Sequence, residues 1–166
     1  MSSLIASHRV LTLSEALALR AELRAAGKPL VFTNGHFDLL HVGHLEYLES
    51  ARALGGALLV AVNDDASTQA LKGRGRPIVP AAERARLIAA LHCVDAALIF
   101  EGETASALIS ALQPEIYVKG GDYQHKPLPE RAAVAAYGGR VVLIDLLPGR
   151  STSALIARIR ALPADS

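Results

Sequence analysis

The hydrophobic positions of this chain form short, uninterrupted runs that alternate with longer stretches of helical periodicity. Five runs of four to seven residues predict strands, at residues 30–33, 57–62, 94–100, 115–119 and 141–146. Strands that are apolar on both faces are typical of a parallel sheet with helices packed on both sides. The pattern therefore predicts an α/β fold built on a five-stranded parallel sheet.

The stretches between these runs predict helices that start or stop at recognisable residues. Thr12 or Ser14 can cap the first helix and Gly27 can end it. The helices are expected at residues 13–26, 43–54, 66–71, 81–91, 104–112, 128–137 and 151–162. The regular alternation of strand and helix favours a single Rossmann-like domain over residues 1–166, with residues 1–28 as an N-terminal helical extension packed on it.

Polar and glycine-rich segments follow four of the five predicted strands. They cover residues 34–44, 63–76, 119–123 and 148–153. In an open parallel sheet, ligands bind beyond the carboxyl ends of the strands, at the point where the strand order reverses. We therefore expect these segments to form one site at the same edge of the sheet.

Composition and charge exclude several classes of protein. The net charge is +1, so no overall basic field indicates a nucleic-acid partner. Cys93 is the only cysteine, which excludes an internal disulfide and a cysteine-based zinc site, and its apolar setting predicts a buried thiol. The N-terminus lacks the apolar core of a signal peptide, and no apolar run is long enough to span a bilayer. We therefore expect a cytoplasmic protein without a membrane partner.

Two histidines form the first candidate site, in the sequence His41-Val42-Gly43-His44. Side chains three apart on a helix lie on the same face, and at a helix start they adjoin free backbone N–H groups. Their rings can donate hydrogen bonds to phosphate oxygens, while Gly43 allows a ligand close to the backbone. The alternatives are histidines that only cap the helix, or half of a metal site. The preceding strand and the sequence TNGHFD favour phosphate binding.

The segment Gly149-Arg150-Ser151-Thr152-Ser153 leads into the last predicted helix. Hydroxyl groups at this position either satisfy the free amides of the helix or bind an anion. Taken alone, capping is the more common role. The preceding strand and the glycine and arginine directly before the hydroxyls favour a part in the site.

The glycine-rich loop after the second strand carries three cations, Lys72, Arg74 and Arg76. Such a loop suits a lid that closes over phosphates, with Lys72 and Arg76 as the leading candidates, or it is simply a solvated charged loop. Arg84, on the next helix, either serves the same site or pairs with a nearby acid.

The sequence Lys119-Gly-Gly-Asp-Tyr123 follows the fourth predicted strand. Its glycines allow a planar base to lie against the backbone, and Asp122 can accept a hydrogen bond from a ribose or a base. A plain glycine turn is equally consistent with it. The chain has neither GxxxxGK[ST] nor GxGxxG after its first strand, which disfavours a P-loop ATPase and a dinucleotide-binding fold.

Together, TNGHFDLLHVGH, KGRGRP followed by ER, VKGGDY and GRSTS resemble the motifs of the cytidylyltransferase-like nucleotidyltransferases, from about Leu13 to Ile159. HxGH and STS occur throughout that superfamily. NGxFDLLHxGH combined with LKGxGRP and VKGGDY is more specific, and is similar to members that adenylylate a heptose 1-phosphate. The resemblance implies the HxGH nucleotidyltransferase fold and transfer of AMP from ATP to D-glycero-β-D-manno-heptose 1-phosphate, which gives ADP-heptose for surface glycans, and pyrophosphate.

The resemblance also implies roles for individual residues. The catalytic group would comprise His41, His44, Lys72, Ser151 and Thr152. The nucleotide would contact Thr33, Asn34, Gly35, His36, Phe37, Gly43, Lys119, Gly120, Asp122, Gly149 and Arg150. The sugar phosphate would contact Arg76, Arg84 and Asp38, although Asp38 is equally consistent with a structural role.

Other implications concern cofactors and partners. The resemblance implies ATP and a sugar 1-phosphate as substrates, Mg²⁺ as the metal with no assignable protein ligand, a homodimer as one option, and a separate sugar kinase upstream in the pathway. The chain departs from its relatives at His36, where they usually carry Cys or Thr, and at Leu146 and Leu147, where some carry an arginine that Arg150 would replace. The alternatives are a cytidylyltransferase for an alditol phosphate or another small phosphate, a non-catalytic nucleotide-binding module, and a structural domain with capped helices.

Overall fold

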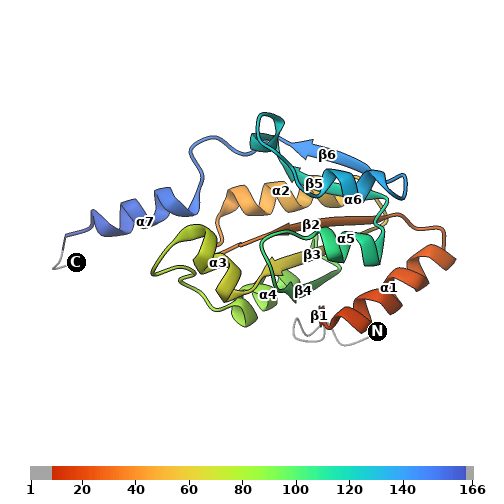
Figure 1. Ribbon diagram of the computed structural model, residues 1–166. Coiled ribbons are helices and arrows are strands. Elements are labelled where there is room, and N and C mark those ends of the chain that lie inside the picture. Colours follow the sequence, from red (N-terminus) through yellow and green to blue (C-terminus); the bar gives the residue numbers. More distant parts are fainter. Residues whose placement is uncertain (1–8, 164–166) are drawn as a thin grey trace.

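The structure is a computed structural model that describes residues 9–163. Its centre is a parallel sheet of six strands in the order β1-β4-β3-β2-β5-β6 (Figure 1). The strands are β1 (Val10–Leu11), β2 (Leu30–Gly35), β3 (Ala57–Asn63), β4 (Ala96–Phe100), β5 (Ile116–Gly120) and β6 (Arg140–Ile144). All five pairings between neighbours are parallel. The parallel sheet is confirmed.

The predicted number of strands is wrong by one. The additional strand, β1, has only two residues and pairs with Ala97 and Leu98 of β4 at the sheet edge. Two residues are too few to produce a hydrophobic pattern that periodicity can detect. Residues 1–8, which belong to the expected N-terminal extension, lie outside the described part of the chain.

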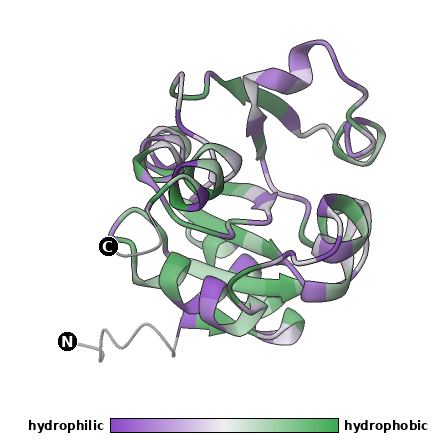
Figure 2. Ribbon diagram, turned by 90° about the vertical axis from the view of Figure 1, so that its left-hand side faces the viewer, coloured by the Kyte–Doolittle hydropathy of each residue, from purple (hydrophilic) through white to green (hydrophobic). Residues whose placement is uncertain are grey.

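Helices cover both faces of the sheet, as the alternation predicted. They are α1 (Leu13–Ala25), α2 (Val42–Arg52), α3 (Asp65–Lys72), α4 (Ala81–Ala90), α5 (Ser106–Leu112), α6 (Arg131–Ala135) and α7 (Thr152–Arg160). Buried side chains of α1, α5 and α6 pack with Phe32 and Leu59 on one face, and those of α2 and α4 pack with Val31 and Val60 on the other. Neighbouring strand residues thus point to opposite faces, and the strands are predominantly hydrophobic (Figure 2).

The first helix is fixed at its start and along its length. Of the two candidate caps, Thr12 is used: its side chain accepts a hydrogen bond from the Glu15 amide, and the Glu15 side chain bonds back to the Thr12 amide. Arg20 is buried and donates to the Leu112 carbonyl at 2.9 Å and to the Glu115 carboxylate. Since Glu115 directly precedes β5, this contact ties α1 to the amino end of the sheet, opposite the predicted site.

The last helix differs from the others. Figure 1 shows α7 extending away from the body of the molecule, and none of its residues is buried. Cys93 is buried, as expected, and burial raises the pKa of its thiol. Between residues 9 and 163, no helix combines the length and the apolar character that a membrane crossing requires.

Candidate functional site

A cavity of about 690 Å³ lies at the carboxyl edge of the sheet. Its wall contains the following predicted site residues: Asn34, Gly35, His36, Phe37, Asp38, His41, Gly43, His44, Lys72, Arg76, Lys119, Gly120, Asp122, Arg150, Ser151 and Thr152. The four segments that follow strands in the sequence therefore meet at one cavity. Thr33, Arg84 and Gly149 are not part of its wall.

The two histidines lie against each other at the start of α2. Their rings stack with centroids 3.9 Å apart and planes inclined by 21°. His41 occupies the N-cap position, but its side chain makes no capping hydrogen bond. The Nδ1 atoms of both rings are buried without a hydrogen-bond partner among the described residues. The geometry therefore does not support a pure capping role.

The electrostatic environment keeps both rings neutral near pH 7. Burial, with a smaller effect of the neighbouring His41, lowers the pKa of His44 to about 4. Burial and the charge of Arg150 also lower the pKa of His41. A neutral imidazole has one N–H donor and one acceptor, so each ring can hydrogen-bond an anion without first carrying a charge.

Gly43 brings α2 and the start of α7 together. A β-carbon at Gly43 would lie 3.0 Å from Nδ1 of His41 and 3.1 Å from the β-carbon of Arg150. The space that this glycine leaves is thus taken by two predicted site residues of the chain itself. From the sequence we expected that space to serve the approach of a ligand.

The turn between β2 and α2 holds Phe37 in a left-handed conformation, with φ of 46°. For a residue with a β-carbon this costs on the order of 1–2 kcal/mol. The Phe37 ring lies over Gly35, where a β-carbon would meet it at 3.0 Å, and edge-on to His44 at 5.5 Å. The turn thus places an aromatic ring behind one of the two histidines.

Thr33, which the sequence predicted to bind the nucleotide, lies outside the cavity wall. Its hydroxyl is buried, shares a hydrogen bond of 2.7 Å with the Tyr47 hydroxyl, and donates to the Val118 carbonyl. Its side chain lies on the face of β2 that α2 covers, and that of Asn34 lies on the other, because successive strand residues alternate between faces. The next residue, Asn34, accepts a hydrogen bond from Tyr117 and lines the cavity.

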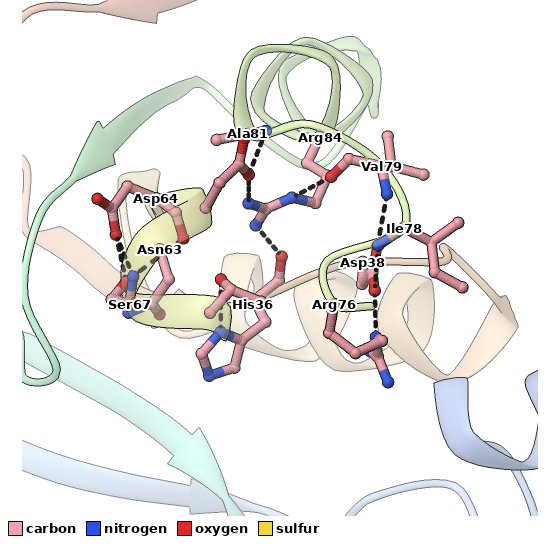
Figure 3. Close-up of polar contacts among 12 residues, drawn as sticks. His36, Asp38, Asn63, Asp64, Ser67, Arg76, Ile78, Val79, Ala81 and Arg84 are labelled. Carbon is pink, nitrogen blue, oxygen red and sulfur yellow. Dashed lines mark hydrogen bonds and ion pairs between the residues drawn. The ribbon is translucent and has the colours of Figure 1, made fainter. Parts of the chain in front are cut away.

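The glycine-rich segment that carries Lys72, Arg74 and Arg76, here called the basic loop (residues 72–80), is anchored at its carboxyl end by Asp38 (Figure 3). The buried Asp38 carboxylate accepts hydrogen bonds from Arg76 Nε at 2.6 Å and from the amides of Ile78 and Val79, both at 2.9 Å. Burial alone would raise the pKa of Asp38, but the hydrogen bonds from Val79, Ile78 and Arg76 outweigh it and lower the pKa. These contacts favour the structural role for Asp38.

The glycine-rich part of the same loop lies open to solvent. Gly73 and Gly75 have φ of 91° and 81°, and a β-carbon at either would meet no atom within 4 Å. Lys72, at the end of α3, lines the cavity and is exposed, whereas Arg74 is exposed and lies outside the cavity wall. Of the three cations, Lys72 and Arg76 are therefore those that reach the site.

Arg84, which the sequence predicted to bind the sugar phosphate, also lies outside the cavity wall. Its side chain is fully buried, and its guanidinium donates to the carbonyls of His36 and Val79 and to the Asp65 carboxylate. It therefore cannot contact a sugar phosphate in the cavity. The alternative left open by the sequence, pairing with a nearby acid, is the arrangement found, with Asp65 as the acid.

His36, the departure from the family pattern, is held by a neighbouring helix. Its Nδ1 lies 3.0 Å from the Thr68 hydroxyl of α3. Burial first, and then the charges of Lys72, Arg84, Lys119 and Arg76, lower its pKa to about 4. The His36 ring thus lies close to several cations and is uncharged near pH 7.

The KGGDY segment forms the wall next to β5. Lys119 is buried, donates to the Asn34 carbonyl at 3.3 Å and lies 5.0 Å from the centre of the Tyr123 ring. Burial lowers its pKa, an effect that Glu130 and Asp122 oppose. A β-carbon at Gly120 would lie 2.8 Å from the Asp122 carboxylate, so the glycine permits this tight turn.

The start of α7 supplies hydroxyl groups to the cavity. Ser151 is its N-cap and accepts a hydrogen bond from the Ala154 amide at 3.1 Å. The capping role is therefore present, while Ser151, Thr152 and Ser153 all line the cavity. Capping and a place in the site are not exclusive here. Gly149, with φ of 71°, turns the chain into this helix from outside the cavity wall.

Part of the cavity wall was not predicted from the sequence. Asn63, Leu71, Tyr123 and Ser153 fall within the predicted segments, whereas the residues outside them are Tyr47, Glu103, Thr104, Pro127, Pro129, Glu130, Leu146 and Leu147. Glu103 and Thr104 follow β4, so the rule that sites form at the carboxyl ends of strands would have found them. Between residues 9 and 163, no three His, Cys, Asp or Glu side chains are grouped to hold a metal ion.

Comparisons with known proteins agree with this geometry. A family model described as cytidylyltransferase-like matches residues 32–149. The chain is 50% identical, over 93% of its length, to the bifunctional protein HldE of Alkalilimnicola ehrlichii. It spans about a third (32%) of that relative's length.

Two solved structures resemble the fold. A lipopolysaccharide core biosynthesis protein from Thermoplasma volcanium superposes with a TM-score of 0.60 and 26% identity, over 72% of this chain and 97% of that one. Pantothenate synthetase from Thermus thermophilus superposes with a TM-score of 0.59 and 19% identity, over 94% of this chain and 68% of that one. The second likeness concerns the fold alone.

Proposed function

Because the chain belongs to the cytidylyltransferase-like family, we propose that it is a nucleotidyltransferase that transfers AMP from ATP to D-glycero-β-D-manno-heptose 1-phosphate. The products are ADP-heptose and pyrophosphate. One observation carries the proposal: a stacked histidine pair shares a cavity with the hydroxyl-bearing start of α7 and with Lys72 and Arg76. Such donors and cations suit a polyphosphate substrate.

The proposed chemistry needs no general base. The second pKa of a phosphate monoester is near ~6, so the sugar phosphate is mostly a dianion at neutral pH and is its own nucleophile. Its oxygen attacks the α-phosphorus of ATP, and the bond from that phosphorus to the pyrophosphate oxygen breaks. The protein must align two anions and stabilise the charge that develops on the transferring and leaving groups.

The residues of the cavity divide this task. His41 and His44 donate hydrogen bonds to the transferring phosphate from neutral rings at the start of α2. Lys72 and Arg76 neutralise the leaving pyrophosphate and the sugar phosphate. Ser151 and Thr152 donate from the start of α7. The adenine and ribose lie along the β5 side, near Lys119, Gly120 and Asp122.

Mg²⁺ is proposed to enter with ATP, held largely by phosphate oxygens, and to supply further charge neutralisation. Two carboxylates of the cavity wall, those of Glu103 and Asp122, are open to solvent and suit hydrogen bonds to metal-bound water. The Asp38 carboxylate is already occupied by Arg76 and two amides, so it does not fit the role of a metal ligand.

The choice of heptose phosphate is supported by three likenesses. The specific motifs resemble heptose 1-phosphate adenylyltransferases, the relative from Alkalilimnicola ehrlichii is half identical over most of this chain, and a structural neighbour is named as a lipopolysaccharide core biosynthesis protein. A separate sugar kinase upstream would supply the sugar 1-phosphate. A cytoplasmic location and a homodimer are part of the same proposal.

The test is pyrophosphate release by the purified protein with Mg²⁺. Each nucleoside triphosphate is combined with β-heptose 1-phosphate, α-heptose 1-phosphate or glycerol 3-phosphate. We expect release with ATP and the β-heptose phosphate above all other pairs. Preference for CTP and an alditol phosphate would establish the alternative cytidylyltransferase. Binding of ATP in calorimetry without turnover on any acceptor would instead establish a non-catalytic nucleotide-binding module.

A further inference from the structure

Arg84 joins three separate segments although it lies outside the cavity (Figure 3). Its Nη1 donates to the His36 carbonyl, its Nε donates to the Val79 carbonyl at 2.7 Å, and its Nη2 pairs with Asp65 at 2.7 Å. The side chain is fully buried. All three nitrogens of the planar guanidinium thus donate at once, which the point charge of a lysine cannot reproduce.

These three segments contain or adjoin residues that line the cavity. His36 begins the turn that leads to the two histidines, Asp65 begins α3, which ends at Lys72, and Val79 ends the loop that contains Arg76. Val79 makes a second contact of this kind, because its amide donates a hydrogen bond to the Asp38 carboxylate at 2.9 Å. A single buried group therefore fixes the turn, the start of α3 and the carboxyl end of the basic loop relative to one another.

The bond to His36 also bears on the neighbouring histidine. The His36 carbonyl belongs to the peptide unit whose orientation sets φ of Phe37, and that angle is a left-handed 46°. This conformation is unfavourable for a residue with a β-carbon and persists only where the surroundings hold it. The hydrogen bond from Arg84 to the His36 carbonyl stabilises this conformation. The resulting turn places the Phe37 ring 5.5 Å from the ring of His44.

We propose that Arg84 is a positioning residue: without touching substrate, it keeps the His36–Phe37 turn in the conformation that seats Phe37 against His44 and keeps Arg76 at the cavity. This positioning role rests on the proposed function only for the kinetic part of its test, which measures turnover. Loss of the guanidinium lets the strained peptide unit relax, so the Phe37 ring withdraws and His44 becomes more open to water. The loop that carries Arg76 loses one of its two anchors at the same time.

The experiment compares Arg84→Lys with Arg20→Lys in the full-length protein. Arg20 is a matched control because it is also buried, also bonds two carbonyls and a carboxylate, and lies at the opposite edge of the sheet. Urea unfolding measures the stability of each variant, and NMR measures the titration of His44. Steady-state kinetics separates kcat from the KM for ATP. Arg86→Ala, at an exposed arginine of the same helix, controls for a substitution on α4 that leaves the buried guanidinium in place.

In Arg84→Lys we expect the pKa of His44 to rise from about 4 toward the ordinary histidine value, because burial is what lowers it. We expect kcat to fall by about 10-fold or more with a smaller change in KM, as for a misplaced catalytic group. Arg20→Lys and Arg86→Ala should leave both quantities unchanged. If Arg84→Lys does not fold, Asp65→Asn, which weakens one partner and keeps its acceptor oxygen, should shift His44 in the same direction.

Two results would overturn the inference. One is a His44 titration that stays at its wild-type position in folded Arg84→Lys or in Asp65→Asn. The other is an equal loss of kcat in Arg20→Lys, which would show a general effect of stability. The titration needs no substrate, so it tests Arg84 even if the wild-type protein proves inactive with heptose phosphates, a failure that would concern the proposed function alone.

Discussion

Replacing Asp38 with asparagine tests how the basic loop is held at the cavity. The carboxylate is only 2% exposed and receives three hydrogen bonds, from Arg76 Nε and from the amides of Ile78 and Val79. Asparagine keeps the shape and one acceptor oxygen but removes the charge, and it turns an NH₂ group toward donors. At least one of the three contacts must therefore be lost.

The expected cost follows from these contacts. A hydrogen bond to a charged group is worth about 1.5–3 kcal/mol, and removing one partner of a buried ion pair costs about 3–5 kcal/mol. The Arg76 side chain is 16% exposed and can turn toward water, which lowers the penalty. We therefore expect Asp38→Asn to reduce the free energy of unfolding by about 2–4 kcal/mol, a large share of the ~5–15 kcal/mol typical of a domain.

Urea unfolding at pH 7 measures this difference. Lys126→Ala is the matched control, because its ion pair with Asp122 is exposed and should contribute no more than about 0.5 kcal/mol. Since the contacts of Asp38 lower its pKa in the folded state, the stabilisation is present above the ordinary carboxyl pKa. It is lost as the pH falls through the lowered value. The difference between wild type and variant should therefore shrink in acid.

A loss below about 1 kcal/mol at pH 7 would refute this reasoning, since a single lost charge-assisted bond already exceeds that figure. A difference that stays constant into strong acid would refute it as well. In either case Asp38 would not be the anchor of the loop, and the assignment of Arg76 to the cavity would lose its structural basis.

The remaining predictions concern the histidines and the start of α7. Because the pKa of both His36 and His44 is lowered to about 4, the unfolded chain binds more protons than the folded one between that pH and about 6.5. The free energy of unfolding should therefore decrease as the pH falls through this window, and His36→Asn should make the decrease shallower; an unchanged slope would contradict the lowered pKa of His36. Ser151→Ala should reduce kcat less than His44→Ala does, because Thr152, Ser153 and the backbone amides remain at the cavity; an equal loss in steady-state assays would contradict a shared role of the hydroxyls.

The sequence predicted the position of the site because the physics behind that prediction is simple. Buried strands of a parallel sheet end at one edge, so the segments after Thr33, Val62 and Lys119 had to meet there. The histidine pair followed from the helical spacing of His41 and His44. These inferences need only the order of the elements, which hydrophobic periodicity determines well.

The direction of individual side chains was harder to predict. Thr33 and Asn34 are neighbours, yet one packs inside the fold and the other faces the cavity, because alternation along a strand separates them. The sequence left open whether Arg84 lines the cavity or pairs with an acid. Its contacts with Asp65 and with the carbonyls of His36 and Val79 decide for the ion pair. Contacts of this kind arise only when the whole chain is folded. The two-residue strand β1 was missed because it is too short to leave a pattern.

The chemical state of the histidines also required the structure. The sequence indicated donors to phosphate, but the stacking of the two rings, the edge contact of Phe37 with His44 and the burial that lowers the pKa of both histidines arise only in the folded chain. Likewise, the chain alone gave no role to the His36 side chain. Its contact with Thr68 and its cationic surroundings make it a part of the cavity wall.

The role of the histidine pair is tested by the turnover of His44→Ala with ATP, Mg²⁺ and β-heptose 1-phosphate, measured as pyrophosphate release. His44 is a preorganised donor to the transferring group, so its loss should lower kcat by on the order of 10²-fold or more. Circular dichroism and urea unfolding should show that the variant remains folded. Near-normal turnover in the folded variant would contradict the central claim that the stacked histidine pair stabilises the transferring nucleotidyl group.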